Sequence, residues 1–258
     1  MSKRNSQASK TAARERLREE RERQAKKDRM RRQLVVAGTG ALVLALAGGI
    51  GYAVVQANKP SEWEAAKDQT LVKPANSGGD GLTVSLGKGG GKTIDIYEDL
   101  RCPACAAFEQ TNGEMLKKGA EEGKLTLRVH LGSIIDDNIG GSGSKNAVSA
   151  LGAALNVSPE AFAEYHGLLY SAEHHPEEID DKFADDSYLL DVAKNVDALK
   201  DSEEFSQAVE KGTYDKWALT VIDEFNEAGI KGTPTVRIDG KDVEQTALPA
   251  ELEKLGVK

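Results

Sequence analysis

Residues 97–105 read Tyr-Glu-Asp-Leu-Arg-Cys-Pro-Ala-Cys, and they hold the only two cysteines of the chain, Cys102 and Cys105. The alternating run from Thr93 to Tyr97 that precedes them is typical of a β-strand. Pro103 fits the first position of a helix. The sequence therefore predicts that both sulfurs lie at the start of a helix that follows a strand.

This position predicts a reactive pair of thiols. The sulfur of Cys102 would lie beside unpaired backbone N–H groups and the positive end of the helix dipole, which favour thiolate over thiol. The sulfur of Cys105, one turn on, can attack a mixed disulfide at Cys102 and release the partner. A disulfide that closes so short a loop stabilises a fold little. We therefore predict that Cys102 is the nucleophile and Cys105 the resolving thiol.

The elements around this segment predict an α/β domain with a helical insertion. Hydrophobic periodicity and turn residues give the order of elements. The predicted elements are a strand at 82–86, a strand at 93–97, a helix at 102–122, a strand at 125–131, a mostly helical region at about 140–230, a strand at 235–238 and a short helix from residue 249.

The N-terminal part of the chain predicts a membrane anchor. Residues 1–33 carry 13 Lys/Arg and 5 Asp/Glu, and residues 34–57 contain no charged residue. A bilayer needs about 20 apolar residues, so 34–57 predicts one transmembrane helix; a cleaved signal peptide is the alternative. The basic tail at 1–33 then stays in the cytoplasm and the rest lies outside. Residues 58–81 are expected to be a linker, with the folded domain at 82–258.

The segment 97–105, together with Phe108 and Glu109, resembles the active-site segment of the DsbA-like branch of the thioredoxin superfamily. Residues 232–236, Gly-Thr-Pro-Thr-Val, resemble the second hallmark of that branch, a loop with a cis-proline before a strand. The resemblance implies a thioredoxin-like fold. Among the members of this branch, the chain resembles those that are anchored in the membrane and have a basic N-terminal tail. It also implies that Pro234 packs against the disulfide and that the backbone of Thr233 pairs with an extended substrate peptide.

The sequence departs from the family at two places. Many relatives carry an acid six residues before the nucleophile, where this chain has Ile96, and Asp95 faces the other side of the strand. Resolution by Cys105 is then expected to rely on water, or on Asp95 or Glu98 reaching in from the rim. The residues between the cysteines are Pro103 and Ala104, which offer no imidazole to stabilise a thiolate. Arg101 would favour the thiolate of Cys102 if its side chain turned toward the sulfur.

These features predict an extracytoplasmic thiol–disulfide oxidoreductase that forms, isomerises or reduces disulfides in exported proteins. A redox partner in the membrane is compatible with this prediction. The alternative is a thioredoxin-like module that binds peptides without redox turnover. A zinc site is disfavoured because one cysteine pair supplies only two of four ligands. The four histidines do not complete it: they are His130, His166, His174 and His175. We expect no metal, no cofactor and, because the body is acidic behind a basic tail, no nucleic acid.

Overall fold

The computed structural model describes residues 18–24, 26–27, 30 and 61–257. The chain forms two units, residues 1–60 and 61–258. In the first unit, residues 18–24 are helical and exposed. No helix among the described residues is long and apolar enough to span a bilayer. The predicted transmembrane segment 34–57 lies outside the described residues.

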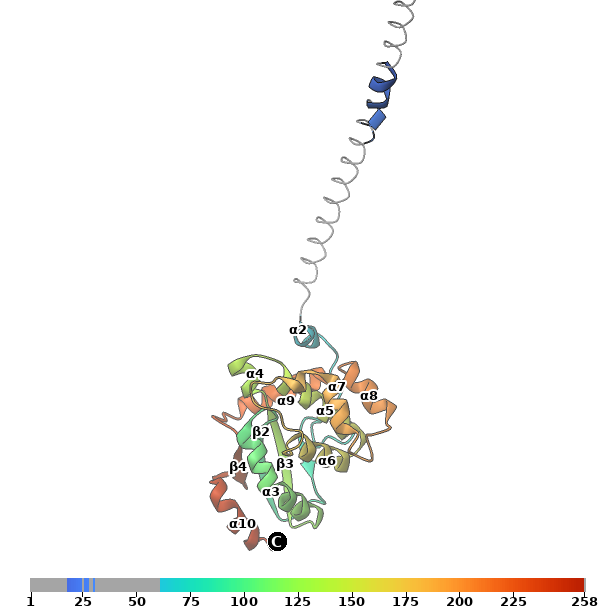
Figure 1. Ribbon diagram of the computed structural model, residues 1–258. Coiled ribbons are helices and arrows are strands. Elements are labelled where there is room, and N and C mark those ends of the chain that lie inside the picture. Colours follow the sequence, from blue (N-terminus) through green and yellow to red (C-terminus); the bar gives the residue numbers. More distant parts are fainter. Residues whose placement is uncertain (1–17, 25, 28–29, 31–60, 258) are drawn as a thin grey trace, which may run out of the picture. The chain divides into compact units, whose positions relative to one another are not determined.

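A five-stranded mixed sheet forms the centre of the second unit (Figure 1). Its order is β1-β3-β2-β4-β5, with β2 and β3 parallel and the other pairs antiparallel. The parallel pair is joined by helix α3, Pro103–Glu121, as a parallel connection requires. The strands are β1 Val84–Leu86, β2 Lys92–Asp99, β3 Leu125–Gly132, β4 Thr235–Ile238 and β5 Lys241–Val243.

The register of β2 and β3 gives the sheet two distinct faces. Ile96 lies opposite Val129, and Tyr97 lies opposite His130. Because side chains alternate along a strand, Ile96 and Glu98 share one face and Tyr97 lies on the other. The Tyr97 ring contacts Phe225 of helix α9, Asp215–Glu227, edge to face. Glu98 therefore lies on the face of the sheet opposite to α9.

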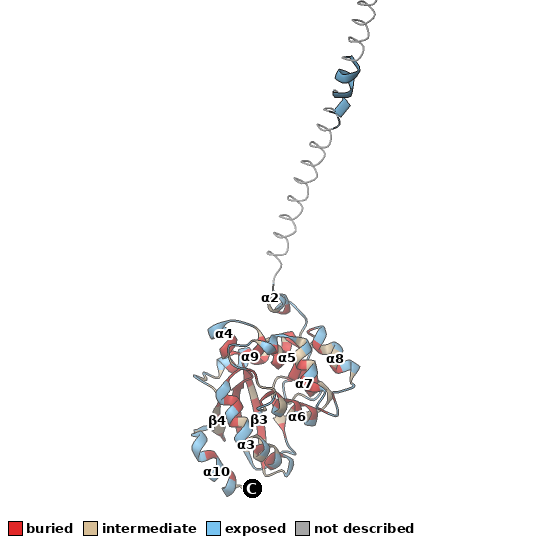
Figure 2. Cartoon of the chain, viewed as in Figure 1, coloured by how far each residue is buried: buried red, intermediate tan, exposed pale blue. Residues whose placement is uncertain are grey.

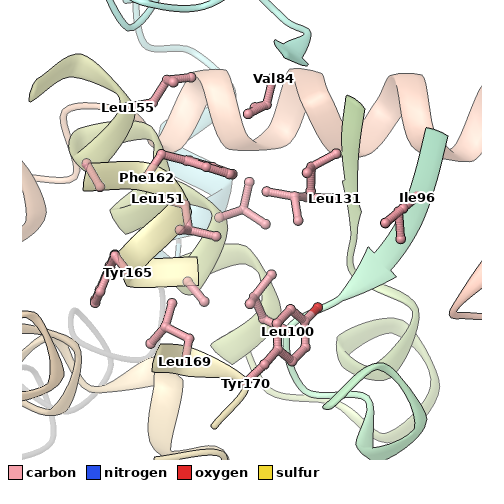
Figure 3. Close-up of a cluster of buried hydrophobic side chains, with 14 of the residues drawn as sticks. Val84, Ile96, Leu100, Leu131, Leu151, Leu155, Phe162, Tyr165, Leu169 and Tyr170 are labelled. Carbon is pink, nitrogen blue, oxygen red and sulfur yellow. The ribbon is translucent and has the colours of Figure 1, made fainter. Parts of the chain in front are cut away.

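The helical insertion predicted at about 140–230 is confirmed and begins somewhat earlier. Its central helix, α5, contacts α6, α8 and α9. Most residues of α5 are buried (Figure 2), and its leucines lie in the core beside the sheet (Figure 3). Leu151 and Leu155 lie in this core with Phe162 of α6. The remaining elements are α4 Ile134–Ile139, α5 Gly143–Val157, α6 Pro159–Leu169, η1 Lys182–Ala184, α7 Asp186–Ala193 and α8 Glu203–Glu210.

The C-terminal part completes the sheet with a hairpin that the sequence analysis only half predicted. Asp239 and Gly240 between β4 and β5 both have positive φ, the geometry that suits a two-residue hairpin turn. The strand at 235–238 was expected, but the short strand β5 after it was not. A 3-10 turn, η2 Gln245–Ala247, and helix α10, Leu248–Lys254, follow.

The predicted linker at 58–81 is wrong from residue 61 onward. Helix α2, Glu62–Ala66, precedes residues that are bonded to the domain. The backbone of Ala75 donates to the side chain of Asn156 at 3.0 Å, and the indole of Trp217 donates to the carbonyl of Gly81 at 2.9 Å. Residues 67–81 contain Pro74 and three glycines and show no strand or helix pattern, yet long-range hydrogen bonds hold them in place.

Candidate active site

Cys102 caps the N-terminus of α3, as the sequence predicted. It has an extended backbone with φ −78° and ψ 117°, and Pro103 is the first helical residue. The backbone N–H of Ala106 donates to the Cys102 carbonyl at 3.1 Å, which closes the first turn. Cys105 lies on the inner side of that turn and is fully buried, while Pro103 and Ala104 are exposed.

The loop before β4 lies against Cys102. The Thr233–Pro234 peptide bond is cis, which confirms the expectation from the Gly-Thr-Pro-Thr segment. The carbonyl of Thr233 is 3.6 Å from the sulfur of Cys102, within reach of a weak hydrogen bond from the thiol. The side chain of Gln245 donates to the Pro234 carbonyl at 2.9 Å and so fixes the loop from the other side. Residues 131 positions apart in the sequence thus form one site.

The two sulfurs have opposite proton affinities. A hydrogen bond from Cys105 and contacts with Thr233 and the N–H groups of Cys105 and Ala104 lower the pKa of Cys102 to about 6, against the opposing effect of burial. Burial raises the pKa of Cys105, and its bond to Cys102 and the charge of Glu98 raise it further. Both cysteines are free thiols in the structure. Cys102 is therefore the thiolate at neutral pH, and Cys105 keeps its proton.

Arg101 does not turn toward the sulfur, which corrects one expectation. Its guanidinium is buried and lies 2.8 Å from Asp136 and 3.1 Å from Asp181. It also donates to the carbonyls of Gly140 and Glu178. Arg101 thus connects the residue before the nucleophile to loops of the helical insertion. Acidic partners and carbonyls hold its charge there, so it is not among the groups that lower the pKa of Cys102.

A buried acid lies at the end of β2, two residues beyond the position where relatives are expected to have one. Glu98 has no solvent exposure, and its Oε2 is 3.0 Å from Nε2 of His166. Its Oε1 has no hydrogen-bond partner. Burial raises the pKa of Glu98 to about 8, against the opposing effect of a hydrogen bond with Glu109. Because this carboxyl raises the pKa of Cys105, it lies within electrostatic reach of the resolving thiol. The expectation that Glu98 reaches in from the rim is therefore wrong.

The side chains of His166 and Glu109 lie next to Glu98. Glu109 of α3 has its Oε2 3.9 Å from Nδ1 of His166, and burial raises the pKa of Glu109. Burial lowers the pKa of His166, which favours the neutral ring. The hydroxyl of Tyr170 points toward the end of β2 and has no hydrogen-bond partner (Figure 3). We call Glu98, Glu109 and His166 the acid–imidazole cluster.

Asp95, the other acid considered, belongs to a different part of the molecule. It lies on the opposite face of β2, where its Oδ1 is 2.9 Å from Nε2 of His130. The imidazole of His130 stacks on Tyr97 with ring centroids 4.3 Å apart. Asp95 is therefore separated from Cys105 by the sheet and takes no part in the site.

The metal-binding alternative finds no donor set in the part of the chain that the structure describes, where no group of three or more His, Cys, Asp or Glu side chains is placed to hold an ion. The histidines have other contacts. His175 is 3.0 Å from the carbonyl of Leu100, and His166 lies in the acid–imidazole cluster.

Glu109 was expected only as part of the family-like segment, with no role of its own, and His166 was not expected in the site. Helical spacing offered a signal for Glu109, because it follows Cys105 by four residues and so lies on the same face of α3. No local signal pointed to His166, which meets Glu98 across 68 residues through the packing of α6.

Comparison with known proteins agrees with this geometry. The family described as Thioredoxin matches residues 84–255. Curated relatives include the serine/threonine-protein kinase PknE of Mycobacterium tuberculosis, 27% identical over 175 residues. The match covers 63% of this chain but only 29% of that protein, so the chain spans less than a third of its length.

Solved structures of similar fold include two from Mycobacterium tuberculosis and one from Actinomyces oris. The disulfide bond oxidoreductase DsbG has a TM-score of 0.59 and 24% identity over 70% of this chain and 90% of that one. DsbA has 0.58 and 22% over 69% and 93%. The thiol-disulfide oxidoreductase MdbA of Actinomyces oris has 0.57 and 24% over 76% and 94%. With the family match over residues 84–255, the chain belongs to the thioredoxin family.

Proposed function

We propose that this chain is a thiol–disulfide oxidoreductase that exchanges disulfides with exported proteins. The observation that carries the proposal is the contrast between the two sulfurs, since the pKa of Cys102 is lowered to about 6 and that of Cys105 is raised. Thiolate is the attacking species, so this contrast supports attack by Cys102 and resolution by Cys105. Relatives of the same fold whose names describe such exchange support it.

The exchange runs in two balanced steps. The Cys102 thiolate attacks one sulfur of a substrate disulfide; an S–S bond forms to Cys102, and the other substrate sulfur leaves as a thiolate that takes a proton from water. Cys105 then loses its proton and attacks the Cys102 sulfur, which forms the Cys102–Cys105 bond and releases the second substrate sulfur. The substrate disulfide is reduced and the cysteine pair is oxidised. The reverse sequence oxidises a substrate dithiol, and the reduction potential decides the direction.

The loop at Thr233 and Pro234 supplies the substrate-binding edge in this proposal. Thr233 lies beside Cys102, so an extended peptide that pairs with its backbone would present a disulfide to the nucleophile. We also propose that residues 34–57 anchor the chain in the cell membrane, with residues 1–33 in the cytoplasm and the domain outside. The length of the uncharged run and the excess of basic residues before it support this orientation.

Reduction of insulin by dithiothreitol, followed by turbidity, tests the activity on the full chain in detergent. Turnover is expected for the wild type and not for Cys102→Ser. Equilibration of the pair with glutathione then gives the reduction potential and so the direction. A chain that binds extended peptides but never exchanges a disulfide would overturn the proposal in favour of a peptide-binding module.

A further inference from the structure

A cavity of about 370 Å³ lies between α3, α6 and the sheet, on the face that carries Glu98. Its walls include Ile96 and Val129 of the sheet and Leu116 of α3, and its lining reaches Glu109 and His166. Exposed Glu164 and Gly167 of α6 also line it, so the cavity opens between the two helices. The buried acid–imidazole cluster therefore separates this cavity from the buried sulfur of Cys105.

Three polar side chains lie along this line from the sulfurs to the cavity. Glu98 acts on Cys105 electrostatically, and its Oε2 is 3.0 Å from His166 Nε2. The other ring nitrogen of His166 is 3.9 Å from Glu109 Oε2, a gap that a small side-chain shift or one water closes. The unbonded Oε1 of Glu98 is available to a further proton donor. Buried polar groups are usually hydrogen-bonded, so the unpaired Oε1 of Glu98 needs an explanation, such as a function in the reaction.

We propose that His166 and Glu109 form a proton path that connects Glu98 to the cavity between α3 and α6. This inference rests on the proposed dithiol exchange and deepens it. Glu98 is protonated at neutral pH. When Cys105 resolves a mixed disulfide, its thiol proton passes to the unbonded Oε1 of Glu98 as Glu98 gives its own proton from Oε2 to Nε2 of His166. The Nδ1 proton of His166 passes to Glu109 as Glu109 releases its proton to water in the cavity, so each group ends in the protonation state in which it began. The proton thus leaves between the two helices, away from the loop at Thr233 that faces the substrate.

The titratable groups around the cluster come from α3, α6 and β2. Tyr170 contributes a hydroxyl from the end of α6, and its pKa is raised, chiefly by burial. Cys102 and Cys105 face Glu98 from the start of α3. Lys117 and Glu114 of α3 line the cavity together with Glu164 of α6. Asp99 also acts on Tyr170, although its own side chain is bonded on the other face of the sheet. The strands contribute apolar side chains to the cavity wall.

The test separates the two steps of exchange in one stopped-flow trace. The reduced full chain is mixed with dithionitrobenzoate, which releases one thionitrobenzoate when Cys102 attacks and a second when Cys105 resolves. The rate of the second release is measured from pH 5.5 to 9, the range around the raised pKa of Glu98. The variants are His166→Gln and Glu109→Gln, which keep size and hydrogen bonding but cannot carry the proton. The matched control is Glu164→Gln, which removes an exposed carboxylate from the same cavity.

The second release should slow by about 10- to 100-fold at pH 7 in His166→Gln and Glu109→Gln, because a positioned proton-transfer group contributes on the order of 100-fold. Its pH midpoint should also move, which a merely structural role would not cause. The first release should stay at the wild-type rate in both variants, and Glu164→Gln should change neither step. An unchanged second step in both variants overturns the proton path. Failure of the first release in the wild type overturns the proposed function instead.

Two glycines that line the cavity give a second test that leaves the cluster's residues in place. A methyl group at Gly113 of α3 would meet the carboxylate of Glu109, whereas one at Gly167 of α6 would meet nothing within 4 Å. Both positions are helical, so alanine suits the backbone at each. Gly113→Ala should slow the second release and Gly167→Ala should not. Equal rates in the two variants would overturn the path even if His166→Gln failed to fold.

Discussion

Glu98 and Asp99 are neighbours at the end of β2, and both are fully buried, yet they lie in different environments on the two faces of the sheet. Asp99 accepts hydrogen bonds from the N–H of Ile135 at 2.8 Å, the hydroxyl of Ser144 at 2.6 Å and the N–H of Arg101 at 2.9 Å. Both of its oxygens are used. Glu98 has one oxygen bonded to His166 and one without a partner.

The difference in hydrogen bonding gives the two carboxyl groups different roles, one in the fold and one in the reaction. Asp99 holds the start of α4 and the first turn of α5 against the end of β2, and a fully bonded carboxylate of this kind makes a corner rigid. Glu98 lies between the resolving thiol and His166, which lines the cavity, and its unbonded oxygen can exchange a proton. The face of Asp99 therefore fixes the position of the active-site segment, and the face of Glu98 serves its reaction. Substitutions on the face of Asp99 should therefore lower the free energy of unfolding, and substitutions on the face of Glu98 should slow the exchange reaction.

The largest expected effect is on the two sulfurs. Cys105→Ala leaves the nucleophile but removes the group that resolves, so it should accumulate mixed disulfides with substrate proteins. Cys102→Ala should accumulate none and should lose turnover completely. Non-reducing electrophoresis after alkylation of free thiols measures both. Trapping by Cys102→Ala instead would reverse the assignment of the two cysteines.

On the face of Asp99, Arg101→Met should cost about 3–5 kcal/mol of the free energy of unfolding, as breaking a buried ion pair does. The guanidinium and Asp136 are both buried, so the variant leaves a buried carboxylate without its closest cation. Urea denaturation measures the loss. The control is Arg128→Met, whose half-exposed guanidinium is 3.9 Å from Asp95 and should matter by less than about 1 kcal/mol. Equal losses of unfolding free energy in the two variants would show that burial of the Arg101 ion pair does not increase its contribution to stability.

The next effect concerns the pH at which Cys102 reacts. Its pKa of about 6 means that about 90% is thiolate at pH 7, where an unperturbed thiol has a few per cent. Alkylation by iodoacetamide should therefore show a midpoint near pH 6. Since the hydrogen bond from Cys105 is the largest cause of the lowered pKa, Cys105→Ala should move the midpoint upward. A midpoint near 8.5 in the wild type would remove the observation on which the proposed function rests.

Local patterns were enough to predict the parts of the site that lie on one continuous segment. Pro103 after Cys102 marked the helix start, and the Gly-Thr-Pro-Thr segment, read with the family resemblance, marked the cis bond; both are confirmed. The strands at the centre of the sheet were predicted for the same reason, because alternation along a strand is visible in the sequence.

Contacts between distant segments were beyond such patterns. The position of Ile96 suggested that the buried acid was absent. The acid instead lies at Glu98, where the packing of α6 brings His166 to it. His166 belongs to the helical insertion and reaches the site only through the packing of α6. Residues 61–81 are fixed by hydrogen bonds to Asn156 and Trp217. Each of these depends on tertiary packing, which periodicity does not encode.

The smallest expected effect compares the two carboxylates directly. Asp99→Asn should cost about 1–3 kcal/mol at pH 7, because the new amide cannot accept from all the donors around it. Glu98→Gln should cost less than about 1 kcal/mol at pH 7, because the amide has nearly the same shape as the neutral, protonated carboxyl and at most the one bond to His166 changes. Urea denaturation measures both variants against the wild type.

The pH dependence of that difference tests its cause. Folded Glu98 keeps its proton up to about pH 8, whereas an unfolded glutamate loses it near its ordinary pKa of 4.5. Folding therefore takes up a proton between these values, and the free energy of unfolding of the wild type should fall as pH rises through this window, by at most about 1.4 kcal/mol per pH unit. Glu98→Gln lacks this proton uptake, so its stability relative to the wild type should rise from pH 5 to pH 8. Asp99, with a pKa raised to about 6, should show the same sign only below pH 6. If the two variants gave parallel profiles from pH 6 to 8, the carboxylates would share one environment and the distinction between the faces would fail.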